Sequence, residues 1–263
     1  MNAPFESAAQ LREAIRRGKF TGPTAGHAAG FVQTNLVILP QRYADDFARF
    51  CELNARACPL IAMTKPGVYR PRAAAAGADV RTDVPRYRVF RRGELQTTEP
   101  TDIRIFWRDD FVAFLLGCSF TFENALLKAG LPVRHIEEGR NVPMYRTSRP
   151  CTPAGSFTGD MVVSMRPFAG DQVEMVREIT RHYPRMHGAP IHVGDPAEIG
   201  IADLSRPDFG QAVTVREDEV PVFWACGVTP QLALLNARCP VAITHSPGCM
   251  FVTDLQDEAY YVP

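Results

Sequence analysis

The sequence lacks the features that mark several large classes of protein. Lysine plus arginine equals aspartate plus glutamate, 29 against 29, so no overall charge would attract nucleic acid or an anionic membrane. No apolar run approaches the roughly 20 residues of a membrane span, and the N-terminus has no apolar signal core. The seven cysteines are odd in number and scattered, unlike a secreted disulfide framework. We therefore expect a soluble, cytoplasmic protein with no nucleic-acid or membrane partner.

Motifs for nucleotides and metals are absent as well. The glycine-spaced segment 18–30 is neither a P-loop nor a GxGxxG fingerprint, and neither HExxH nor a CxxC pair occurs. His187, His192 and Asp195 are residue types that bind metals, but their spacing matches no pattern with a known geometric reason. We expect no cofactor and no metal.

What is present is the composition of an ordinary globular protein of 263 residues, with 46% hydrophobic and 22% charged residues. Hydrophobic spacing predicts helices over 7–17, 41–55, 109–117, 121–130, 171–183 and 229–237. Strands are predicted over 35–40, 133–137, 159–168, 189–194, 219–227 and 241–246, with a hairpin formed by 86–90 and 94–98. Residues 64–85 read as an irregular, exposed connection. Strands that alternate with helices indicate an α/β class with at least partly parallel pairing.

The stretch 138–205 has a pattern of its own, a β-α-β unit with proline-rich borders. We expect it to form a smaller α/β portion, inserted between a first core part, 1–137, and a second core part, 206–263.

The segment FWACGVTPQ is the sharpest local signal. An apolar strand runs into Cys226, and a helix then starts with Thr229 as the expected N-cap. A helix N-terminus at such a turn suits a carboxylate, and its field would lower the pKa of Cys226. A buried cysteine in a tight turn is the alternative.

Two further turns could supply proton transfer. His245 ends an apolar strand just before a Ser-Pro-Gly turn, and histidine moves protons near neutral pH. Ser119 and Glu123 open the helix at 121–130, where Ser119 could cap and Glu123 could act as a base. The alternatives are a hydrogen-bonded structural histidine and a glutamate that compensates the helix dipole.

The segment 134–147 is dense in charge and largely aperiodic. It includes Asn141, Tyr145 and Arg146, and its arginines could hold a carboxylate with two hydrogen bonds. A surface network of salt bridges would explain some of these residues equally well.

Several blocks together resemble the D-glutamate cyclase family, whose bacterial members are labelled hydro-lyases. In order, they are GPTAG, NLVILP, PRYRVF, GCSFTFE, RHIEEGRNVPMY, VVSMRP, HGAPIHVGDP, FWACGVTPQ and THSPG. The resemblance runs from about residue 10 to the C-terminus. It implies a three-layer α/β core with a smaller two-layer α/β portion. It also implies cyclisation of D-glutamate to 5-oxo-D-proline with loss of water.

This reaction needs a base, an acid and groups that hold two carboxylates. In our hypothesis the helix N-terminus at Thr229 holds one carboxylate, and Arg146 or Arg166 holds the other. His245 moves the proton, assisted by Glu123 or Cys226. Ser119, Asn141 and Tyr145 are expected to contact the substrate.

All of these side chains should then converge on one polar cleft. A hydro-lyase for another small acid and a non-catalytic carboxylate-binding protein in 5-oxoproline metabolism stay open as alternatives, and so does assembly into a homo-oligomer.

Overall fold

The computed structural model describes residues 5–96 and 98–263, and it contains two antiparallel sheets. The strands are β1 Phe31–Pro40, β2 Leu60–Met63, β3 Tyr87–Arg91, β4 Glu94–Leu95, β5 Phe111–Gly117, β6 Met144–Pro150, β7 Asp160–Ala169, β8 His192–Val193, β9 Glu219–Ala225, β10 Ala242–His245 and β11 Phe251–Gln256. The helices are α1 Ala8–Arg16, α2 Ala44–Leu53, α3 Phe120–Lys128, α4 Arg134–Glu137, α5 Val173–Arg181 and α6 Thr229–Ala237. Among these described elements, no helix has the length and apolarity of a membrane span.

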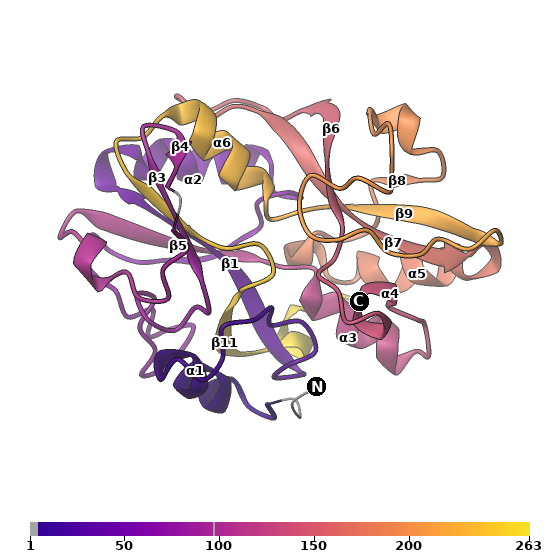
Figure 1. Ribbon diagram of the computed structural model, residues 1–263, viewed down its shortest axis with the longest axis horizontal. Helices are drawn as coiled ribbons and strands as arrows, with labels where there is room; N and C mark the ends of the chain where they lie inside the picture. The colour runs from indigo at the N-terminus through magenta and orange to yellow at the C-terminus, as the bar shows by residue number, and fades with distance from the viewer. Residues whose placement is uncertain (1–4, 97) are drawn as a thin grey trace.

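The larger sheet has seven strands, in the order β2-β5-β1-β10-β3-β4, with β11 also paired to β1. On one face, α2 and α6 pack through Phe47, Phe50 and Leu234 against Phe114 and other strand side chains. Figure 1 shows α2 and α6 above this sheet and α1 below it. The three layers confirm the α/β core that the resemblance implied.

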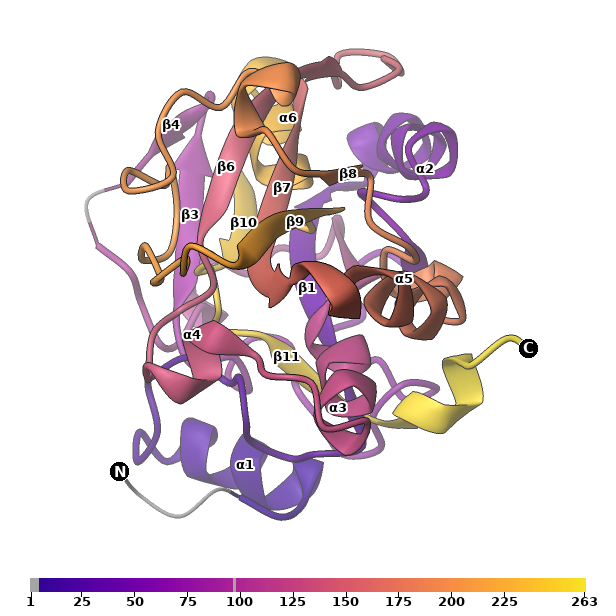
Figure 2. The same ribbon diagram turned by 90° about the vertical axis from the view of Figure 1, so that its right-hand side faces the viewer.

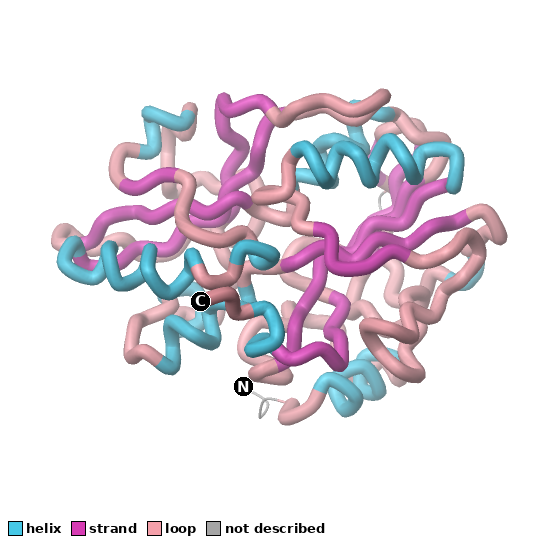
Figure 3. The backbone as a smooth tube through the Cα atoms, turned by 180° about the vertical axis from the view of Figure 1, so that it is seen from behind, coloured by secondary structure: helices cyan, strands magenta, loops and turns pink. Residues whose placement is uncertain are grey.

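The opposite face of the larger sheet is covered mainly by irregular chain, as the tube in Figure 3 shows. Ala74, Ala75, Ala78, Val80 and Val84 pack there against the strands, and each is at most 3% exposed. The prediction that 64–85 is irregular is confirmed, but the prediction that it is exposed holds only in part, since these five residues are buried. Small alanine side chains let the backbone itself approach the sheet, so no amphipathic periodicity was needed.

The smaller sheet has the order β6-β7-β9-β8. Helices α3 and α5 lie beside each other on one of its faces, where Phe122, Phe168 and Trp224 form the core (Figure 2). Strand β9 pairs with β7 over Val163–Ala169, so this sheet draws on chain beyond residue 205. The domain limits at 138 and 205 stay a prediction.

Three other expectations are wrong. Every strand pair among the described residues is antiparallel, whereas parallel pairing was expected. Residues 109–117 were predicted as a helix, but 111–117 form β5, which is buried along its whole length. A strand covered on both faces carries a continuous apolar run, and such a run does not distinguish strand from helix. Residues 134–137, predicted as part of a strand, form the short helix α4.

Strands β2, β6 and β11 were not predicted. The remaining elements agree with prediction to within a few residues, although β8 is only two residues long. The predicted hairpin is present as β3 and β4, with residue 97 outside the described residues. All seven cysteines lie within the described residues and are unpaired and buried.

Candidate functional site

A cavity of about 410 Å³ lies where the two sheets approach each other. Arg86 and Arg88 line it from β3 and the residue before it, and Glu99 lines it from the chain after β4. Asn141 contributes from the loop after α4, and Ser246 from the turn after β10. Residues 208–211, from the connection between β8 and β9, close one side. Segments far apart in the sequence therefore share one polar cavity.

Two positive charges of this cavity come from one strand face. Tyr87 and Val89 point into the core under the sheet, so the alternation of a strand turns Arg86 and Arg88 to the other face. Arg88 Nε donates to Glu99 Oε1 at 3.0 Å, and Arg86 Nη1 lies 3.5 Å from Glu99 Oε2. Asp208 also lines the cavity and lies 3.6 Å from Arg146 at the rim, so three arginines face two carboxylates, and the net positive charge suits an anionic ligand.

Three buried polar atoms on the lining residues have no hydrogen-bond partner within the described chain. They are Arg86 Nε, Asn141 Oδ1 and Ser246 Oγ. A buried donor or acceptor without a partner is unfavourable by about 1–3 kcal/mol, so most such groups in folded proteins are paired. A donor, an acceptor and a hydroxyl thus lie unpaired in side chains that line one cavity.

Asn141 is held in place by the turn that follows β10. Its Nδ2 donates to the carbonyl of Pro247 at 3.1 Å. Gly248 has a φ of +84°, and a Cβ on it would lie 2.6 Å from Asn141 Oδ1. Only glycine permits both this backbone conformation and this close approach. The Ser-Pro-Gly turn thus positions the amide at the cavity.

A second polar cluster lies in the interior between α3 and β7. Arg166 donates through Nε to Glu123 Oε1 at 2.8 Å, and its Nη2 hydrogen-bonds the same oxygen. It also donates to Ser119 Oγ at 2.9 Å and to Ser164 Oγ at 3.0 Å. Figure 2 shows α3 and β7, the two elements that carry this pair. The positive charge of Arg166 and the negative charge of Glu123 therefore compensate each other inside the protein.

Glu123 is ionised although it is only 2% exposed. Burial acts to raise the pKa of its carboxyl, but the nearby His135 and Arg166 outweigh burial and hold the pKa below its usual value. His135 Nε2 lies 3.4 Å from Glu123 Oε1. A carboxylate buried behind these partners is not open to a substrate, which argues against Glu123 as a general base.

His245 fills a gap in the larger sheet. Strand β1 pairs with β10 at Val37 and Ile38 and with β11 up to Thr34, so Leu36 has no strand partner on that side. The Leu36 N–H donates to His245 Nδ1 at 3.1 Å instead. Burial lowers the pKa of His245 to about 4, so the ring is neutral at pH 7. The contacts are those of the structural histidine, and its catalytic role stays a prediction.

Two predictions about the turn before α6 are wrong. Val228, not Thr229, is the N-cap of α6, and Thr229 Oγ1 instead accepts from Val162 N at 3.0 Å. The pKa of Cys226 is raised to about 11 rather than lowered, because burial disfavours the thiolate. The predicted segments do converge, since Cys226 packs with Cys118 and Val142, but the meeting place is an apolar cluster rather than a polar cleft.

The other predicted residues divide between interior and surface. The Tyr145 hydroxyl donates to the Leu204 carbonyl at 2.7 Å, and burial raises the pKa of this buried phenol. Arg146 is exposed and lies 3.6 Å from Asp208, at the rim of the cavity. Of the predicted site residues, Asn141 alone lines the cavity.

Sequence reasoning missed Arg86, Arg88, Glu99 and Ser246. The alternation Arg-Tyr-Arg-Val in the predicted hairpin could have indicated two arginines on one strand face. Nothing local in the sequence indicates that Ser246 meets them.

The metal-type residues make structural contacts. His187 Nδ1 lies 2.7 Å from the Arg56 carbonyl, and His192 Nε2 lies 2.7 Å from the Asp195 carbonyl. Within residues 5–96 and 98–263, no three histidine, cysteine, aspartate or glutamate side chains are grouped so as to hold a metal ion.

Comparison with known proteins decides the family. A model of the D-glutamate cyclase family matches residues 112–254, more than half of the chain. A protein from Rubrobacter xylanophilus is 59% identical over 262 residues, which is 100% of each chain. The chain belongs to the D-glutamate cyclase family. Further relatives are a protein from Stutzerimonas stutzeri, 58% identical over 96% of this chain and 95% of its own, and one from Bacillus licheniformis, 55% identical over 96% of each.

The names of all three relatives begin with the words "Putative hydro-lyase". These names and the family membership confirm the expectation of an enzyme of the hydro-lyase class. A solved structure of a nitrogen repressor-like protein from Methanococcus jannaschii covers 94% of this chain and 98% of its own, with 10% identity and a TM-score of 0.39. A score that low supports no argument about this family's site.

Proposed function

We propose that the cavity lined by Arg86, Arg88, Asn141 and Ser246 is the substrate site of a hydro-lyase that cyclises D-glutamate to 5-oxo-D-proline. The proposal rests on the three unpartnered buried polar atoms that belong to side chains lining this cavity, two of whose lining residues are arginines. Family membership supports the reaction type. Glutamate carries two carboxylates and one ammonium group, a net charge of about −1 near neutral pH. This charge complements the net positive charge of Arg86, Arg88 and Arg146 over Glu99 and Asp208.

The site offers a group for each demand of the reaction. Arg86 and Arg88 present guanidinium groups that can hold a carboxylate through two parallel hydrogen bonds. Asn141 and Ser246 supply further hydrogen bonds at the other end of the substrate. In this assignment Glu99, already beside the arginines, accepts a proton from the substrate ammonium group.

The cyclisation can proceed without a cofactor. The ammonium group first loses a proton to become a nucleophilic amine, and its nitrogen then bonds to the γ-carboxyl carbon. The bond from that carbon to one carboxyl oxygen breaks. The proton held by the base and a second proton from the nitrogen join the departing oxygen, which leaves as water. Because both reacting groups belong to one molecule, holding its two ends close together supplies much of the rate enhancement.

Activity with the two isomers of glutamate tests the proposal. The purified protein is incubated separately with D- and L-glutamate, and 5-oxoproline is measured by chiral chromatography. We expect product from D-glutamate. Failure to form 5-oxoproline from either isomer removes the cyclase. Binding of 5-oxoproline without any turnover would instead favour a carboxylate-binding protein.

Conservative variants test the location of the site. Arg86→Lys keeps the charge but loses the planar fork, and we expect it to lower kcat/KM by about 10²-fold, the effect of losing a well-aligned ionic hydrogen bond. Arg181→Lys is the matched control, since Arg181 forms an exposed salt bridge with Glu178 on α5. Equal activity in the two variants would contradict the assignment.

A further inference from the structure

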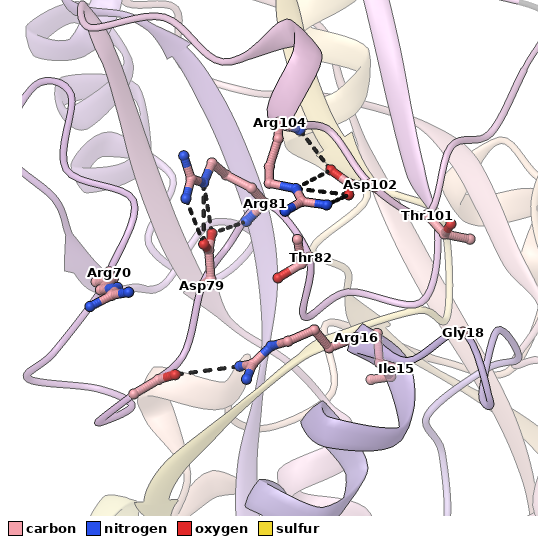
Figure 4. Close-up of a pocket in the computed structure, with 11 residues that line it drawn as sticks. Ile15, Arg16, Gly18, Arg70, Asp79, Arg81, Thr82, Thr101, Asp102 and Arg104 are labelled. Atoms are coloured by element: carbon pink, nitrogen blue, oxygen red, sulfur yellow. Dashed lines mark hydrogen bonds and ion pairs between the residues drawn. The ribbon is translucent and has the colours of Figure 1, made fainter.

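A second polar cavity, of about 400 Å³, lies between the end of α1 and the irregular chain on the lower face of the larger sheet. Figure 4 shows the side chains that line it. Four of them are arginines, Arg16, Arg70, Arg81 and Arg104. None of these belongs to the proposed substrate site.

Two of the arginines are oriented by a carboxylate two residues away. Arg81 forms a double hydrogen bond with Asp79, at 2.9 Å from Nε and 2.7 Å from Nη2. Arg104 binds Asp102 in the same way, at 2.9 Å and 2.6 Å. Figure 4 shows these two pairs on one side of the cavity and Arg16 on the other. In each pair the aspartate engages Nε and Nη2, so the N–H groups of Nη1 remain for another acceptor.

The other two arginines differ from each other. Arg16 binds the fully buried Asp83 through Nε at 2.9 Å and Nη2 at 2.6 Å. The Arg70 side chain has no hydrogen bond or ion pair with another described residue, and its guanidinium carbon lies 5.5 Å from the centre of the Tyr69 ring. Four arginines therefore face three aspartates, and Arg70 supplies the uncompensated positive charge.

We propose that this cavity is an accessory site for a compact divalent oxyanion, of the phosphate or phosphomonoester kind. The free donors of Arg70, Arg81 and Arg104 come from separate points on the cavity wall. A tetrahedral anion accepts hydrogen bonds from several directions at once, whereas a single carboxylate is matched by one guanidinium fork. The three aspartates hold Arg16, Arg81 and Arg104 in position, and the uncompensated charge of Arg70 makes the cavity favour anions over neutral ligands.

The same chain segments line both cavities. The Ile103 N–H donates to the Arg81 carbonyl at 3.0 Å, and the Tyr87 N–H donates to the Pro100 carbonyl at 2.9 Å. The segments 81–88 and 99–104 are thus joined by hydrogen bonds, with the accessory cavity at one end and Arg86, Arg88 and Glu99 at the other. An oxyanion that pulls on Arg81 and Arg104 would shift the segments that carry the substrate-site arginines. This second part, a change in substrate affinity, rests on the proposed function.

Calorimetric titration with inorganic phosphate, and separately with methyl phosphate, tests the site without any assay of activity. We expect binding by the unaltered protein and a loss of about tenfold in affinity in Arg70→Gln, since one charge-assisted contact is removed. Arg42→Gln is the matched control, because Arg42 also lies over a neighbouring tyrosine, Tyr43, at 4.9 Å, but outside the cavity. Neither substitution leaves a carboxylate unpaired, so both variants should fold.

The location is tested by Arg86→Lys, which changes a residue that lines the proposed substrate site and not the accessory cavity. Phosphate binding that survives in this variant supports a separate accessory site. Loss of phosphate binding there, absence of binding in the unaltered protein, or equal binding in Arg70→Gln and Arg42→Gln would each overturn the proposal. For the coupling, the affinity for 5-oxoproline is measured with and without phosphate, and an unchanged affinity overturns that part alone.

Discussion

The buried pair of Glu123 and Arg166 makes a sharp prediction about stability. In Glu123→Gln the side chain keeps its shape but loses its charge, so Arg166, which is 1% exposed, has no carboxylate to compensate it. Removing one partner of a buried ion pair destabilises a protein by about 3–5 kcal/mol. That is a large part of the 5–15 kcal/mol by which folded domains are usually stable. We expect a loss in this range at pH 7, measured by urea denaturation with circular dichroism.

A matched control separates burial from charge. Glu178→Gln makes the same substitution in a glutamate that also pairs with an arginine, Arg181 at 2.6 Å, but on an exposed helix surface. Because water screens exposed charges, we expect little change in this variant. Equal losses in Glu123→Gln and Glu178→Gln would refute the reasoning, since burial would then have no part in the effect.

The pH dependence of the unfolding free energy tests the same ion pair independently. The pKa of Glu123 is lowered in the folded state, so its ionisation stabilises the protein above the ordinary pKa of 4.5. This contribution is lost as the pH falls below 4.5 and through the folded pKa. The difference in unfolding free energy between the unaltered protein and Glu123→Gln should therefore shrink in acid. A difference that stays constant from pH 7 to the acid range would contradict the assignment.

Two further predictions concern the end of β10 and the turn after it. Gly248→Ala should reduce stability and weaken 5-oxoproline binding, because the new Cβ meets Asn141. Gly130 is the control: it has a similar φ of +76° but no atom within 4 Å of an added Cβ, so Gly130→Ala should affect stability alone. Unaltered 5-oxoproline binding in Gly248→Ala would contradict this prediction. His245→Asn keeps an acceptor for the Leu36 N–H but removes the titrating ring. Since the folded pKa of His245 is lowered from 6.5 to about 4, the unaltered protein should lose up to about 3 kcal/mol relative to His245→Asn as the pH falls from 6.5 to 4, measured by urea denaturation.

Local patterns were sufficient for most elements. The helix at 229–237 was predicted with the limits that the structure has, because a proline at its second residue and a run of helix-forming side chains define it locally. The hairpin at 86–98 was predicted from two short β-prone runs joined by Arg92-Gly93, and Gly93 has the positive φ that such a turn requires. These features depend on residues close together in the chain.

The chain itself does not settle whether an apolar run is strand or helix. Residues 111–117 form a strand because they lie between β1 and β2 and are covered on both faces. The alternation of strands and helices predicts at least partly parallel pairing, but every described pair is antiparallel. The neighbours of each strand, and hence its direction, are fixed by contacts between distant segments.

The features of the candidate site likewise divide into those determined by the sequence and those determined by the tertiary structure. The sequence by itself determined the residue types available, the family and the glycine turn at 246–248. Only the tertiary structure decided which of those residues share a cavity. It buried Cys226 and His245, and burial shifted their pKa values away from what the local sequence indicated. It also brought Arg86, Asn141 and Ser246 together, because strand pairing joins β3 to β10 across most of the length of the chain.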